Sequence, residues 1–141
     1  MRSGHFIGKV GAKAIIARDG KVLMVRADDE TAWDLPGGRI NTGETLPEAL
    51  ARELREELGI TASFTRFVHS SQVVHTREGT NQLFIACEVA LTDPGAPMAV
   101  DPAEAAHLRW VGKDELATLE SYENCTQALR EYWKAPNPEH A

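Results

Sequence analysis

The segment between Thr45 and Gly59 constrains the fold of this chain more than any other part of its sequence. Thr45 and Glu48 can form a capping box, in which each side chain accepts a hydrogen bond from the other residue's backbone amide. Pro47 lies in the first turn, where its missing N–H costs least, and Gly59 suits the left-handed conformation that often ends helices. These signals predict a helix over residues 46–58. A leucine recurs every four residues along it, and this stripe predicts packing against a sheet. The four leucines are Leu46, Leu50, Leu54 and Leu58.

Three carboxylates share a neighbouring face of the same helix. Glu53, Glu56 and Glu57 are separated by three and four residues, so their side chains fall within one arc. Carboxylates this close repel one another and favour a positive partner, and hard oxygen ligands in this number suit Mg²⁺ or Mn²⁺. The alternative is a solvated helix whose charges pair along its surface, Glu48 with Arg52 and Arg52 with Glu56. The helix by itself leaves both interpretations open.

The residues before the helix favour the metal-binding interpretation. Residues 33–35 read as a short extended stretch, and Pro36, Gly37 and Gly38 then predict a loop that runs to about Glu44. We expect this loop to bring a further carboxylate beside the acidic face of the helix.

The rest of the chain alternates strand and helix signals. Strands are expected over residues 10–18 and 21–26, joined by a hairpin turn at Asp19 and Gly20. Two more strands, 61–74 and 82–91, flank a turn at 76–80, and a polar connection over 92–102 leads to a strand over 107–111. A short helix over 114–119, a helix over 122–133 and a mobile tail over 136–141 complete the chain. This order predicts an α+β fold with a mixed central β-sheet flanked by helices.

Length and charge narrow the classes of protein to which the chain can belong. Its 141 residues fit one domain, and its formal charge of −6 has the wrong sign for a protein that coats nucleic acid, so no nucleic-acid partner is expected. Two cysteines form neither a disulfide framework nor a CxxC site, and no apolar run reaches the roughly 20 residues of a membrane span. We expect a cytoplasmic protein with reduced thiols and no membrane partner. A homodimer is possible, with Tyr132 and Trp133 of the last helix either supplying a contact or capping the sheet.

A complete motif links the loop to the acidic helix. Gly38, five residues, Glu44, seven residues and the run RELREELGI over residues 52–60 fill every fixed position of a Nudix box. The chain therefore resembles the Nudix hydrolase family, and the order of strands and helices around the box resembles that domain as well. The resemblance implies an α/β/α sandwich and a single Nudix domain over residues 1–141. It also implies an enzyme that hydrolyses the diphosphate linkage of nucleoside diphosphate derivatives, using divalent cations and an attacking water.

The same resemblance assigns roles to individual residues. Glu53, Glu56 and Glu57 match the catalytic glutamates that bind metal, and Glu53 is the first candidate for the general base. Gly37 and Glu104 are further candidate metal ligands, and His107 could serve in place of Glu104. Structural support of the box is expected from four residues, Gly38, Glu44, Arg52 and Gly59.

Substrate contacts are expected next to the box. Arg26 and Arg39 match basic positions that face substrate phosphates, a task that suits the planar fork of arginine. Trp33 is a candidate base contact or, alternatively, part of the core. The other side chains suited to base recognition are Phe6, Phe84, Tyr122, Asn81, Gln82 and Asn124.

The identity of the substrate is marked less clearly. His75 and Thr76 stand where some relatives carry the proline of ADP-ribose enzymes or the tyrosine of dinucleoside polyphosphate enzymes, so neither label applies. A (deoxy)nucleoside triphosphate that is converted to a monophosphate is the favoured substrate. The alternatives are a nucleotide sugar or other nucleoside diphosphate derivative, the 5′ end of an RNA, and a non-catalytic Nudix module that senses nucleotides.

Overall fold

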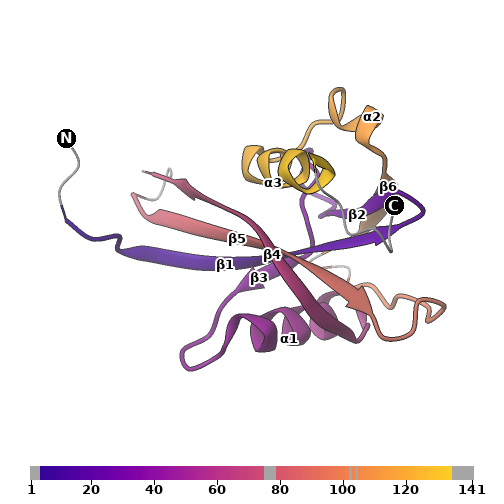
Figure 1. The fold of residues 1–141 in the computed structure, drawn as a ribbon, viewed down its shortest axis with the longest axis horizontal. Coiled ribbons are helices and arrows are strands. Elements are labelled where there is room, and N and C mark those ends of the chain that lie inside the picture. Colours follow the sequence, from indigo (N-terminus) through magenta and orange to yellow (C-terminus); the bar gives the residue numbers. More distant parts are fainter. Residues whose placement is uncertain (1–3, 75–78, 102, 104, 135–141) are drawn as a thin grey trace.

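A computed structural model describes residues 4–74, 79–101, 103 and 105–134 of the chain. It contains, in chain order, β1 (Gly8–Arg18), β2 (Lys21–Arg26), β3 (Gly37–Arg39), α1 (Leu46–Leu58), β4 (Ala62–Val73), β5 (Asn81–Leu91), β6 (His107–Val111), α2 (Lys113–Leu116) and α3 (Glu123–Lys134) (Figure 1).

Strand β1 organises the sheet because it pairs with three other strands. The sheet has the order β4-β5-β1-β2-β6, with β1 and β5 parallel and the other pairs antiparallel. Strand β3 pairs with residues 11–13 of β1, whereas β2 pairs with Ala17 and Arg18. β1 thus changes partner from β3 to β2 along its length.

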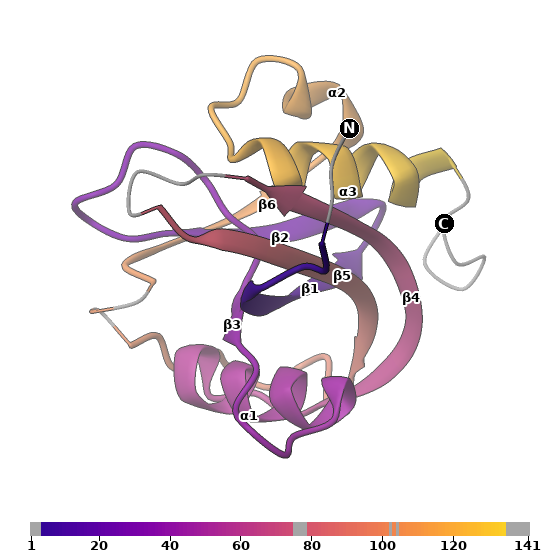
Figure 2. The ribbon, with the colours of Figure 1, turned by 90° about the vertical axis from the view of Figure 1, so that its left-hand side faces the viewer.

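The sheet lies between two helices (Figure 2), with α1 on one side and α3 on the other. Alternation along β1 sends Ala12 and Ile16 into the core under α1 and Ile15 into the core under α3. The predicted leucine stripe of α1 is confirmed, since residues 50, 54 and 58 are buried and Leu46 packs against the same core. Tyr132 of α3 is 2% exposed. Tyr132 therefore packs in the core between α3 and the sheet, whereas Trp133 is only partly buried.

The turn and cap predictions are confirmed. Asp19 and Gly20 both have positive φ, 52° and 78°, as a tight hairpin turn requires. The capping box of Thr45 and Glu48 is formed, and Gly59 ends α1 with φ 65°. The boundaries of α1 agree with the prediction.

Some boundaries were predicted wrongly. The loop expected from Pro36 onward contains β3, because Gly37 and Gly38 allow the backbone to approach β1 closely enough to pair. A Cβ at Gly37 would collide with the carbonyl oxygen of Ala12. Helix α2 is shorter than predicted, and α3 begins at Glu123. Residues 76–78 of the predicted turn and the predicted tail lie outside the described residues.

Within the described ranges, no helix combines the length and the apolar character that crossing a membrane requires. Cys87 and Cys125 are both buried and form no disulfide.

Candidate active site

Arg52 of α1 ties the preceding segment to the helix. Its guanidinium forms a bidentate pair with Glu44, with an Nε–Oε2 distance of 2.7 Å and an Nη2–Oε1 distance of 3.0 Å. Nη2 also donates to the carbonyl oxygen of Arg39, at 2.8 Å. Hydrogen bonds from Arg52 and from the amide of Asn41 lower the pKa of Glu44. The end of β3 and the segment after it are therefore held against α1 by one side chain.

The same guanidinium lies between two of the three candidate catalytic glutamates. Its Nη1 donates to Glu53 Oε1 at 2.8 Å and to Glu56 Oε2 at 3.2 Å. Glu48 does not pair with Arg52, because its carboxylate accepts from the amide of Thr45 in the capping box. Only the Arg52–Glu56 half of the surface-pairing alternative is therefore present.

Each of the two glycines of β3 contacts one glutamate of the acidic face. The amide of Gly37 donates to Oε1 of Glu57 at 3.3 Å, and Glu57 is 6% exposed. The carboxylate of Glu53 lies so close to Gly38 that a Cβ there would come within 2.5 Å of its carboxyl carbon. Both glycines thus leave room for a glutamate of α1. Glu56 is the most exposed of the three glutamates.

The chemistry of this donor set suits a hard divalent cation. Three glutamates on one helix face supply carboxylate oxygens, the ligands that Mg²⁺ and Mn²⁺ prefer. Among the described residues no three His, Cys, Asp or Glu side chains already converge as a metal site. Arg52 contacts Glu53 and Glu56 and offsets their charge in this structure. Glu104 lies outside the described residues, and His107 Nε2 lies 2.9 Å from Asp28 Oδ1.

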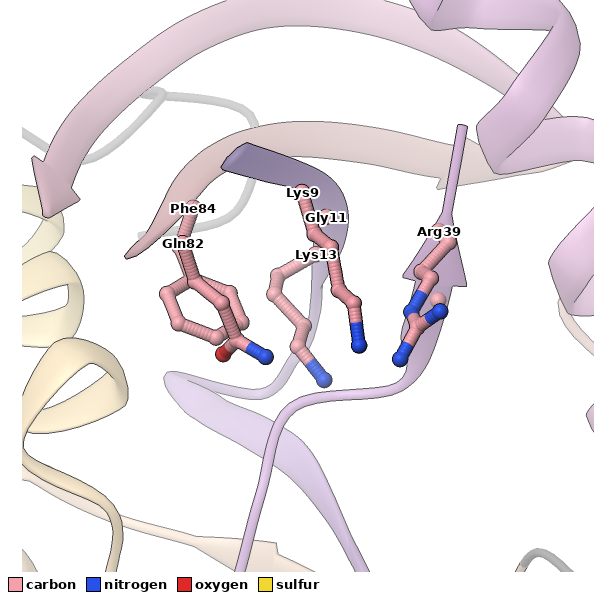
Figure 3. A pocket seen from close by; sticks show the side chains of 7 residues that line it. Lys9, Gly11, Lys13, Arg39, Gln82 and Phe84 are labelled. Atoms are coloured by element: carbon pink, nitrogen blue, oxygen red, sulfur yellow. The ribbon is translucent and has the colours of Figure 1, made fainter. Parts of the chain in front are cut away.

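A basic cavity of about 130 Å³ opens beside β3 (Figure 3). Lys9 and Lys13 reach it from one face of β1, and Arg39 reaches it from β3. The side-chain nitrogens of the three residues point toward the same space in Figure 3. The remaining lining residues are Gly11, Gly38, Gln82 and Phe84. The arrangement suits a ligand that combines negative charge with a planar ring.

A polar cavity of about 170 Å³ lies beside Gly37 and Glu57. Arg26 lines it and stacks over the Trp33 ring, with its guanidinium carbon 5.4 Å from the ring centre. The hydroxyl of Tyr122 donates to Glu30 Oε2 at 2.9 Å, and burial together with Glu30 raises the pKa of Tyr122 to about 12. Arg39 and Arg26 therefore line different cavities, which share Lys13.

The other predicted base contacts are placed unequally. Gln82 and Phe84 line the basic cavity, and Tyr122 lines the polar one. Trp33 packs against the core under α3 and lines neither cavity. Asn124 lines a narrow space beside Phe84. The remaining two candidates are also outside both cavities: Phe6 is exposed and Asn81 donates to the carbonyl oxygen of Ile7.

Sequence reasoning missed three charged residues that the structure places here, Lys9, Lys13 and Asp34. Lys13 Nζ lies 3.0 Å from Asp34 Oδ2, and Lys13 is only 9% exposed. Burial alone would lower the pKa of Lys13, but Asp34, Cys125 and Glu57 outweigh it and hold this pKa above its ordinary value. The available signal was a lysine within an otherwise apolar strand, because a buried cation requires a partner.

Known proteins of one family are similar to this chain. The model of the NUDIX domain family matches residues 8–131. The CTP pyrophosphohydrolase of Escherichia coli is 44% identical over 63 residues, which span 42% of this chain and 47% of that protein's length. A Bacillus subtilis protein named "Putative 8-oxo-dGTP diphosphatase" is 31% identical over 107 residues, covering 75% of this chain and 68% of the relative. An RNA pyrophosphohydrolase of Novosphingobium aromaticivorans is 29% identical, and the match covers 74% of this chain and 77% of the relative's length.

A solved structure has the same fold. The solution structure of the E. coli ORF135 protein superposes with a TM-score of 0.74 at 28% identity. The match covers 92% of this chain and 93% of that one.

Proposed function

Because the chain belongs to the Nudix family, whose domain model matches residues 8–131, we propose that it hydrolyses the diphosphate linkage of nucleoside diphosphate derivatives with the help of a divalent cation. One observation carries the proposal. Two of the three glutamates on one face of α1, Glu57 and Glu53, contact the β3 glycines, and cavities lined by arginine and lysine adjoin the same two glycines.

The residues that would hold the cation are Glu53, Glu56 and Glu57, with Gly37 and Glu104 as further candidates. A bound Mg²⁺ or Mn²⁺ offsets the charge that builds up on the phosphoryl oxygens and lowers the pKa of a water. Glu57 is oriented by the amide of Gly37. Glu53, packed against Gly38 and paired with Arg52, is the carboxylate that we assign to take the proton from the attacking water.

We assign the binding of the substrate phosphates to two arginines. Arg39 extends into the basic cavity, and within the described part of the chain its guanidinium has no hydrogen bond or ion pair. Arg26 lines the polar cavity but also donates to the carbonyl oxygen of Glu30. Arg39 is therefore better placed to bind an anion.

A (deoxy)nucleoside triphosphate is the favoured substrate, with pyrophosphate and a nucleoside monophosphate as products. The E. coli and Bacillus relatives carry names of triphosphate-cleaving enzymes, which supports this choice. The name of the Novosphingobium relative supports the 5′ end of an RNA as a second candidate. The formal charge of −6 disfavours a long polyanion.

The deciding experiment measures pyrophosphate and phosphate release with and without Mg²⁺ or Mn²⁺. The panel contains nucleoside triphosphates, oxidised nucleotides, nucleotide sugars, ADP-ribose and an RNA with a 5′-triphosphate. Glu57→Gln should lower turnover at least about 100-fold. Glu131→Gln, which changes an exposed glutamate of α3, is the matched control and should retain activity. Nucleotide binding without turnover on any substrate would favour the sensing alternative.

A further inference from the structure

The ion pair of Lys13 and Asp34 stands between the two cavities. Lys13 lines both of them, and Asp34 lines the polar one. In the pairing of β1 with β3, Lys13 is opposite Gly37, the residue whose amide contacts Glu57. The pair is therefore next to the proposed reaction centre and is also part of the cavity walls.

The hydrogen bonds of the pair leave a defined capacity for a ligand. Asp34 Oδ1 accepts from the amide of Leu35 at 2.8 Å and from the thiol of Cys125 at 2.9 Å. Asp34 Oδ2 accepts from Lys13, which leaves it one further lone pair. The ammonium of Lys13 has three N–H groups, of which one meets Asp34 and a second reaches the carbonyl oxygen of Leu35 at 3.5 Å. The pair can thus offer one donor next to one acceptor.

Charge decides what such a site recognises. The carboxylate of Asp34 cancels the charge of Lys13, so the pair is a weak ligand for phosphate and a good one for a neutral group. The guanidinium of Arg39, in contrast, carries an uncompensated charge among the described residues. Each nucleobase presents a hydrogen-bond donor beside an acceptor on its pairing edge, and the pair is complementary to such an edge.

A flat apolar surface lies beside the pair. The ring of Phe84 lines the basic cavity, and Lys13 Nζ lies 5.9 Å from its centre. A planar ring placed against Phe84 would therefore lie within reach of the Lys13 ammonium. On the basis of the proposed function, we propose that Lys13 and Asp34 read the edge of the substrate's nucleobase and so determine which nucleotide is preferred.

The test measures kcat and KM of the wild type and three variants with each of four ribonucleoside triphosphates. Lys13→Met removes the donor, Asp34→Asn changes the acceptor, and Lys21→Met removes an exposed lysine of β2 as the matched control. Inorganic tripolyphosphate, which has phosphates but no base, serves as a competitive inhibitor. Thermal melting followed by circular dichroism shows whether each variant folds, and Asp34→Asn gives the answer if Lys13→Met does not fold.

The expected result is a selective loss of base recognition. Both site variants should raise the KM for the preferred nucleotide about tenfold or more, change kcat less than about threefold, and reduce the differences among the four bases. The inhibition constant of tripolyphosphate should not change. An equal weakening of tripolyphosphate binding would show that Lys13 binds phosphate. Unchanged base preference, or equal losses for all four nucleotides, would also overturn the proposal.

Failure of the proposed function is a separate outcome. If the wild-type protein hydrolyses none of the nucleotides, equilibrium binding of the same four nucleotides and of tripolyphosphate replaces kinetics. A nucleotide preference that disappears in Lys13→Met supports base recognition without catalysis, and a preference that persists refutes it.

Discussion

The carboxylate of Glu53 packs directly against the Cα atom of Gly38. The space that a side chain at position 38 would occupy is filled by this carboxylate, with its carboxyl carbon 2.5 Å from the ideal Cβ position. Because Gly38 has no side chain, α1 and β3 can approach each other with Glu53 between them.

Gly38→Ala should displace Glu53 while leaving the fold in place. The added methyl group collides with a side-chain terminus, which can rotate away, so the expected effect is loss of geometry at the site. We expect kcat/KM to fall about 100-fold with a melting temperature close to that of the wild type. Gly95→Ala, whose Cβ would meet only one side-chain oxygen at an ordinary 3.6 Å, is the control. A fully active Gly38→Ala enzyme would show that Glu53 need not occupy this position.

The parts of the site that the sequence predicted are those built from local signals. The capping box, the leucine stripe and the stop at Gly59 depend on neighbours within a few residues, and each is present in the structure. The three glutamates share a face for the same local reason.

The parts that escaped prediction depend on contacts between distant residues. Strand β3 exists because two glycines pair with residues of β1 more than 20 positions earlier. Asp34 meets Lys13 across 21 positions and Cys125 across 91. No local sequence pattern predicts which carboxylate will neutralise a lysine in an apolar strand. The pairing of Lys13 with Asp34 could therefore be recognised only from the three-dimensional structure.

Arg39→Gln should weaken substrate binding more than turnover. Arg39 extends into the basic cavity, and the charged hydrogen bonds that we assign to it act on the phosphates of the substrate. We expect the KM for a nucleoside triphosphate to rise about tenfold, because a hydrogen bond to a charged group contributes on the order of 1.5–3 kcal/mol. Steady-state kinetics with Arg130→Gln on α3 as the control test this. An unchanged KM would move the phosphate site away from Arg39.

Arg66→Met should destabilise the fold without acting at the site. Arg66 Nε lies 2.9 Å from Oε1 of Glu88, which is fully buried, and its guanidinium stacks over the ring of Tyr132. Removal of this cation leaves less compensation for a buried carboxylate. Because Arg66 itself is about one-third exposed, we expect a loss of roughly 2 kcal/mol in the free energy of unfolding.

Denaturant unfolding measures this loss, with Lys134→Met as a control that removes an exposed pair with Glu131. The double variant Arg66→Met, Glu88→Gln should recover part of the loss, since no uncompensated carboxylate remains. Equal stability of wild type and Arg66→Met would show that other contacts suffice for Glu88.

The two thiols should be inert to alkylation in the folded protein. Burial raises the pKa of Cys87 to about 11, and burial together with Asp34 raises that of Cys125 further. Since only the thiolate reacts, iodoacetamide at pH 8 should label neither residue in the native state and both in denaturant, as measured by mass spectrometry. The raised pKa of Cys87 means that its protonated form stabilises the fold at neutral pH. This contribution is lost as the pH rises from the ordinary thiol value toward about 11, so native labelling should appear over that interval. Rapid native labelling at pH 8 would place a thiol at the surface and contradict the packing of Cys87 under α1 or of Cys125 under α3.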